Sequence, residues 1–161
     1  MEREPFEPVR SKLNSMIGYL DELSSELPAK ADDYLSAGQI LRGFVERKCQ
    51  VAMECAIDAN GLLISITGGA VPLSARDSFE AVHQLDAIEE EVCRRFQNTL
   101  VGFRNRLVHD YEQLDNRIVY HTARLLITYG NRYVTNLTVY LDRQQQGRPP
   151  AASAPAPQGK S

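Results

Sequence analysis

The chain has few cysteines and histidines, and it has no long apolar run. Its three cysteines, Cys49, Cys55 and Cys93, are odd in number and lack C-x-x-C spacing, so neither a disulfide framework nor a metal site is predicted. Two of them lie within a helical apolar pattern, where a small buried side chain is expected. No segment approaches the roughly 18 apolar residues of a membrane span, and residues 1–5 lack the apolar centre of a signal peptide. The cytoplasm is therefore the expected location, without a membrane partner.

The charges show no strong excess of one sign. A net charge of −3 and a pI of about 5.6 disfavour a protein that coats nucleic acid indiscriminately, but they leave room for a local basic cleft. The hydrophobic share of 43% is that of a globular protein, and it predicts one folded domain over residues 1–144. From residue 145 the chain is rich in Gln, Pro, Ala and Ser, so residues 145–161 are predicted to be disordered.

Apolar residues recur at helical spacing along almost the whole folded part. This pattern is typical of an all-α, up-and-down bundle of about five helices, in which one pair is long. In the last helix, the predicted stripe runs through Ile118, His121/Thr122, Leu125, Tyr129, Tyr133, Leu137 and Tyr140/Leu141. The predicted helices cover about residues 9–27, 36–66, 75–85, 86–110 and 115–141.

The second predicted helix contains a conflicting signal. Asn60-Gly61 is a strong turn pair, yet the apolar stripe keeps its phase across it, and Gly68-Gly69 offers a better end. We therefore predict an unbroken helix. Its start is predicted at or near a capping box formed by Ser36 and Gln39.

The segment with the most chemical content is Gly102–Tyr111, near the end of the fourth predicted helix. It holds Arg104, then His109 after four intervening residues, and then Tyr111, behind an apolar lead-in. Arginine and histidine are the pair that a metal-free ribonuclease needs. The guanidinium holds the scissile phosphate, and an imidazole, which titrates near neutral pH, moves the proton of the 2′-hydroxyl. Such chemistry requires no metal and no cofactor.

The spacing also constrains the geometry of this pair. On a regular helix the side chains of Arg104 and His109 point about 140° apart, so one straight helix cannot aim both at one phosphate. Either the helix ends or kinks near Asp110, or a second copy of the chain completes the site. We expect both. A two-fold dimer would bring two Arg/His pairs into one cleft and concentrate positive charge there.

Two segments resemble a known family. Gly102–Tyr111 resembles the signature of the HepT-like toxins of the HEPN superfamily, whose motif is Arg-polar-x3-His-x-Tyr, with Asn105 at the polar position. Glu46–Asn60 is similar to the second-helix segment of that family, with its polar-Gln-x-Ala-x-Glu-x-x-x-Asp pattern. Together they place about residues 9–142 within the family. The resemblance implies a HEPN-like homodimer in which two protomers meet along the helix that carries the motif.

The resemblance implies a metal-independent endoribonuclease toxin of a HEPN/MNT toxin–antitoxin system. His109 is then expected to accept the 2′-hydroxyl proton, and Arg104 to stabilise the charge on the phosphate. Asn105 is expected to orient the histidine, to bind phosphate, or only to solvate the helix surface. Arg106 is expected to contact RNA or a partner. At Arg104 and His109 the sequence matches the family motif.

Tyr111 carries the regulatory part of the resemblance. In the HepT-like family, the tyrosine at this position receives AMP from a cognate minimal nucleotidyltransferase, and the modification silences the toxin. The resemblance therefore implies that Tyr111 is the modification site and that the nucleotidyltransferase is the antitoxin partner. Added phosphate beside Arg104 would repel the phosphates of RNA, so inhibition is physically reasonable.

Two other functions remain open. One is a non-catalytic HEPN subunit that presents substrate or nucleotide to a nucleotidyltransferase partner, and the other is a helical dimerisation protein without a ligand. Intact Arg104, His109 and Tyr111 favour the ribonuclease, because a binding subunit has little need for an acid–base histidine. His83 and His121 lie in other helices without a matching arginine, so no catalytic role is predicted for them.

Overall fold

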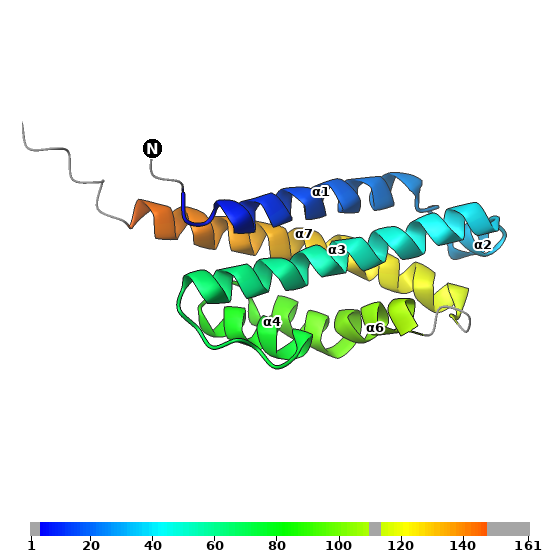
Figure 1. Ribbon diagram of the computed structural model, residues 1–161. Helices are drawn as coiled ribbons and strands as arrows, with labels where there is room; N and C mark the ends of the chain where they lie inside the picture. Colours follow the sequence, from blue (N-terminus) through cyan, green and yellow to red (C-terminus); the bar gives the residue numbers. More distant parts are fainter. Residues whose placement is uncertain (1–3, 110–113, 148–161) are drawn as a thin grey trace, which may run out of the picture.

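The computed structural model describes residues 4–109 and 114–147, and these form an all-α bundle (Figure 1). This confirms the predicted fold class. The segments predicted as helices all appear, together with one short additional helix. In chain order the helices are α1 (Glu7–Glu26), α2 (Ala31–Leu35), α3 (Gln39–Ile66), α4 (Ala75–Gln84), α5 (Glu90–Arg95), the π-helical turn η1 (Phe96–Leu100), α6 (Val101–His109) and α7 (Asn116–Gln146).

The three longest helices form the body of the bundle. In Figure 1, α1 in blue and α3 in cyan to green run side by side, with α7 in yellow to orange behind them. The most extensive helix contact is that between α1 and α3. The helices α4, α5, η1 and α6, drawn in green, cover the other side of α3. The helix α6, which carries Arg104 and His109, therefore packs against α3.

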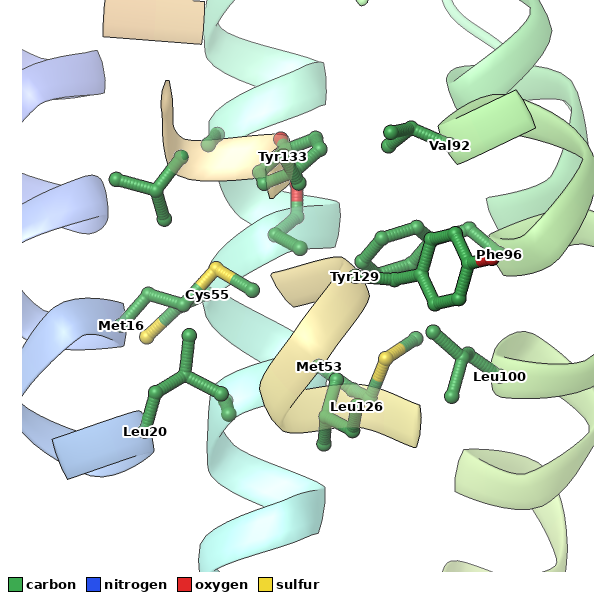
Figure 2. Packing of buried hydrophobic residues seen from close by; sticks show 14 of the residues in the cluster. Met16, Leu20, Met53, Cys55, Val92, Phe96, Leu100, Leu126, Tyr129 and Tyr133 are labelled. Atoms are coloured by element: carbon green, nitrogen blue, oxygen red, sulfur yellow. The ribbon is translucent and has the colours of Figure 1, made fainter. Parts of the chain in front are cut away.

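The core is made by the apolar faces of these helices (Figure 2). The close approach of α1 and α7 depends on Gly130, where a Cβ atom would lie 3.0 Å from Leu20 Cδ1. Near the start of α7, the buried residues are Val119 and Leu126 instead of the predicted Ile118 and Leu125. Labelled core residues in Figure 2 include Met16 and Leu20 of α1, Met53 and Cys55 of α3, Phe96 and Leu100 of η1, and Leu126, Tyr129 and Tyr133 of α7.

The helix α3 continues through Asn60-Gly61, as predicted. Asn60 is fully buried, and its side chain is paired on both sides. Its amide donates to Ser78 Oγ of α4 at 3.1 Å, and its oxygen accepts from the Tyr133 hydroxyl of α7 at 2.6 Å. The asparagine thus connects three helices and does not form a turn, because burial favours the paired helical conformation.

Several predicted helix starts can be compared with the structure. The capping box of Ser36 and Gln39 is wrong: the N-cap of α3 is Gly38, without a side-chain cap, and Ser36 ends the short helix α2. The prediction missed α2 because five residues are too few to show a period. By contrast, Ser74 accepts a hydrogen bond from the backbone of Asp77, and Asp115 accepts from the first turn of α7. These two caps follow the usual chemistry of helix N-termini.

The fourth predicted helix is present as α5, η1 and α6, which follow one another without a break in the helical backbone. In η1 the backbone N–H of Val101 bonds to Phe96 O, a π-helical pattern between the regular helices α5 and α6. At the other end of the chain, α7 reaches Gln146, two residues into the predicted tail, and residues 148–161 lie outside the described part. By length and composition α3 could cross a membrane, but half of its apolar window is buried in the bundle, as in the core helix of a soluble protein.

All three cysteines are buried and free, and burial was predicted for the two that lie within the helical apolar pattern. Burial raises the pKa of the Cys93 thiol to about 11 and raises the pKa values of Cys49 and Cys55 as well. The cause is the loss of solvent around the thiolate form. These cysteines therefore serve packing and are poor nucleophiles at neutral pH.

Candidate functional site

The motif residues lie on α6, which three buried apolar side chains attach to the core. These side chains are Val101, Phe103 and Leu107, and the polar side chains between them lie at the edge of the core or in solvent. This places Arg104 on the side that faces α3, whereas His109 lies at the described end of the helix.

Arg104 is held in a half-buried position. Its Nη2 lies 3.9 Å from Glu54 Oε1 of α3, and its Nη1 donates to Asn105 Oδ1 at 3.3 Å. Glu54 Oε1 in turn accepts a hydrogen bond of 3.0 Å from Gln50. The Nε atom of Arg104 is buried, and no hydrogen-bond partner for it is found among the described residues. The guanidinium is therefore oriented from one side, while part of it stays open to solvent.

The contact between Glu54 and Arg104 joins the two sequence segments that resemble one family. Gln50 and Glu54 belong to Glu46–Asn60, and Arg104 belongs to Gly102–Tyr111. Sequence analysis did not assign Glu54 to the site. The available signal was its place within the second family-like segment, but only the packing of α6 on α3 brings the two charges together.

His109 is exposed, and within the described part of the chain it makes no hydrogen bond or ion pair. No contact between His109 and Arg104 is present in this single chain, which agrees with their angular separation on a regular helix. Asn105 contacts Arg104 and not the histidine. A phosphate bound by both Arg104 and His109 would thus need a rearranged helix end or a second chain.

Arg106 lies on the other side of α6 from Arg104. It is exposed, and it lines a groove of about 710 Å³ between α6 and the beginning of α7. In the described residues it has neither a carboxylate partner nor a side-chain hydrogen bond. Within residues 4–109 and 114–147, this guanidinium is therefore not committed to another side chain.

The remaining predicted site residue, Tyr111, lies outside the described residues, as does Asp110. The other two histidines have structural contacts: His83 Nδ1 lies 3.0 Å from Ile88 O, and the His121 ring meets Tyr120 edge-on. Among the described residues, no three His, Cys, Asp or Glu side chains gather as ligands of a metal would.

Known structures share this fold. The chain is similar to the solved structure of a tri-AMPylated Shewanella oneidensis HEPN toxin in complex with MNT antitoxin, with a TM-score of 0.73 and 20% identity over 83% of this chain and 98% of that one. It is also similar to YutE, a cytosolic protein of unknown function from Bacillus subtilis. That TM-score is 0.71, with 19% identity over 87% of this chain and 95% of the other.

Sequence comparison gives the family. The chain is 27% identical over 133 residues to the tRNA nuclease HepT of Aphanizomenon flos-aquae (strain 2012/KM1/D3), which covers 83% of this chain and 89% of the relative. The family model described as "Ribonuclease HepT-like" matches residues 16–136, a span that includes α3, the Arg104–Glu54 contact and the whole of α6. The chain therefore belongs to the HepT-like ribonuclease family.

Proposed function

We propose that this chain is a metal-independent endoribonuclease toxin, with Arg104 and His109 as its catalytic residues. The observation that carries the proposal is a guanidinium that faces Glu54 on the same short helix as an exposed histidine, which makes no hydrogen bond or ion pair with the described residues. The HepT-like ribonuclease family supports RNA as the substrate. The relative named a tRNA nuclease makes tRNA the first RNA to test.

The proposed reaction needs one base and one cation at the scissile phosphate. The unprotonated imidazole of His109 accepts the proton of a ribose 2′-hydroxyl, whose oxygen attacks the adjacent phosphorus. The bond from phosphorus to the 5′-oxygen breaks, and a proton returns to that oxygen, leaving a 2′,3′-cyclic phosphate on the other product. Arg104 binds the non-bridging oxygens, where charge develops in the transition state.

A homodimer is part of this proposal. Because Arg104 and His109 point to different sides of α6, two chains that meet along α6 would supply a complementary pair across the interface. The histidine of the second chain, in its protonated form, is then placed to donate its own proton to the leaving oxygen. Asn105 keeps the Arg104 guanidinium in place, and Arg106 binds RNA outside the reacting bond.

The proposed regulation is AMP transfer to Tyr111 by a cognate minimal nucleotidyltransferase antitoxin. The similar Shewanella oneidensis toxin is described as tri-AMPylated and in complex with MNT antitoxin, which supports this partner and this modification. One or more AMP groups close to His109 in sequence would place negative charge where an RNA phosphate binds. We expect toxin and antitoxin to act in the cytoplasm.

Growth of cells that express the chain without a partner tests the proposal. Wild type should arrest growth, and His109→Ala should not. His121→Ala is the matched control, because His121 is an exposed histidine on α7, outside the motif segment, and it should arrest growth like wild type. Equal toxicity of His109→Ala and wild type would contradict the proposed site. Harmless wild type would favour the non-catalytic HEPN subunit.

A further inference from the structure

A groove lies between α6 and the beginning of α7, and it reaches Arg76 of α4. We call it the α6–α7 groove, and its polar wall includes Arg76, Thr99, Arg106 and Thr122. Gly102 and Arg106 lie on one face of α6, and His109 follows Arg106 by three residues, so it lies on nearly the same face one turn farther along. At about 710 Å³ the groove is in the size range of sites that hold a small organic ligand.

Arg76 is fixed at the edge of this groove by the π-helical turn. Its Nε donates to the carbonyl of Gln97 at 2.9 Å, and the Gln97 amide donates back to the Arg76 carbonyl at 3.1 Å. The guanidinium then reaches α6, since a Cβ atom at Gly102 would lie 3.6 Å from Arg76 Nη2. Within residues 4–109 and 114–147, neither terminal nitrogen of Arg76 has a hydrogen-bond partner. An arginine oriented through Nε in this way presents two donors to a ligand.

Among the described residues that line the groove, two are arginines, Arg76 and Arg106, and one is an acid, Asp115. Neither Arg76 nor Arg106 forms an ion pair in the described part of the chain, whereas Arg94 and Arg132 each contact a carboxylate that ties helices together. The acid on the groove wall, Asp115, is engaged by the backbone N–H groups of the first turn of α7. In the described lining, Arg76 and Arg106 thus border the groove without a carboxylate partner, while the Asp115 carboxylate accepts hydrogen bonds from the backbone of α7.

We propose that the α6–α7 groove binds the RNA strand next to the scissile phosphate, with Arg76 and Arg106 holding its phosphates. The inference rests on the proposed ribonuclease function and extends it to α4. RNA is the occupant because the groove offers paired cations and neutral hydroxyl and amide groups, which match a phosphate–ribose backbone. Arg76 is thereby a substrate-binding residue more than 25 positions before the motif.

The test is RNA binding in a background that does not cleave. His109→Ala protein is compared with the His109→Ala/Arg76→Gln double variant for binding of bulk tRNA, by fluorescence anisotropy across a salt series. His109→Ala/Arg143→Gln is the matched control. Arg143 is an exposed arginine without a described partner, and it lies about 40 Å along α7 from the groove end of that helix.

The Arg76→Gln change should weaken tRNA binding about fivefold to tenfold near 100 mM salt. It should also lower the slope of log K against log salt by about 0.7 to 0.9, the value for one lost phosphate contact. The groove proposal would be overturned if the Arg76→Gln variant had the same tRNA affinity and the same salt slope as the Arg143→Gln control. If wild type still cleaved tRNA in that case, the proposed ribonuclease function would stand. If wild type neither binds nor cleaves tRNA, both proposals fail. A loss of dimerisation in Arg76→Gln, with unchanged tRNA affinity of the remaining dimer, would assign the groove to a second copy of the chain and overturn the proposal.

Discussion

Replacing Tyr133 by phenylalanine should destabilise the frame on which α6 rests. The Tyr133 hydroxyl donates to Asn60 at 2.6 Å and lies 3.0 Å from the carbonyl of Ala56, and both side chains of the Tyr133–Asn60 pair are fully buried. Burial raises the pKa of Tyr133 well above its ordinary value, so the hydroxyl stays a neutral donor. The substitution leaves the aromatic contacts with Phe79 and Phe96 but removes the donor from a buried amide oxygen. A buried acceptor without its donor costs about 1 to 3 kcal/mol.

A double-mutant cycle separates this cost from lost packing. In an Asn60→Ala background no amide oxygen is left without a donor, so Tyr133→Phe should then cost less by about 0.5 kcal/mol or more, which is the coupling energy of the pair. Tyr129→Phe is the matched control on the same helix. Its hydroxyl donates to Glu91 at 2.9 Å in a partly buried position that water can reach, so its loss should cost less than the loss of the Tyr133 hydroxyl.

Urea denaturation at one fixed protein concentration measures these differences, because association would otherwise contribute to the apparent stability. The denaturant slope m should stay constant across the variants, since the folded frame is unchanged. A Tyr133→Phe variant as stable as wild type, or no less stable than Tyr129→Phe, would refute the assignment of a stabilising buried network.

Three further predictions concern the site and the thiols. Glu54→Gln should change the melting temperature by only a few degrees, because both side chains of the Glu54–Arg104 ion pair are partly exposed. It should lower kcat of RNA cleavage about tenfold, whereas the control Asp58→Asn on α3 should leave kcat unchanged. An unchanged kcat in Glu54→Gln would exclude Glu54 as a positioning residue. With the pKa of Cys93 raised to about 11, its thiolate fraction at pH 8 is near 10⁻³, so thiol reagents should modify the cysteines only in urea. As the pH rises, the thiols of the unfolded chain ionise at a lower pH than those of the folded chain. The free energy of unfolding should therefore fall above about pH 8.5. Rapid labelling of the native protein would contradict this burial. Tyr111→Phe should stay toxic and escape the antitoxin, and mass spectrometry after co-expression should find AMP-sized increments on wild type alone; neutralisation of Tyr111→Phe without a mass change would mean inhibition by occlusion.

Much of the fold follows from apolar periodicity. The unbroken helix α3 was predictable because the stripe keeps its phase through Asn60-Gly61, although the buried partners of Asn60 come from helices distant in sequence. The register at the start of α7 could not be predicted from the sequence. Ile118 and Val119 are both apolar, and only packing selects Val119 for the core. The π-helical turn η1 has no periodic signature of its own, and it appears only as an irregularity within an otherwise continuous helix.

The candidate site divides in the same way. The spacing of Arg104 and His109 indicates the chemistry, because residue types and their separation are local properties of the chain. The roles of Glu54 and Arg76 are not local. Glu54 reaches Arg104 only because α6 packs on α3, and Arg76 reaches the groove only through the carbonyl of Gln97 in η1.

The most direct test of the central claim is tRNA cleavage by purified protein in excess EDTA. Wild type should cleave bulk tRNA and leave 2′,3′-cyclic phosphate ends, at a rate that EDTA does not change, because the proposed base and cation are His109 and Arg104. His109→Ala should lose about 10²-fold or more in rate, and His121→Ala should match wild type. Cleavage by His109→Ala at the wild-type rate would contradict the account.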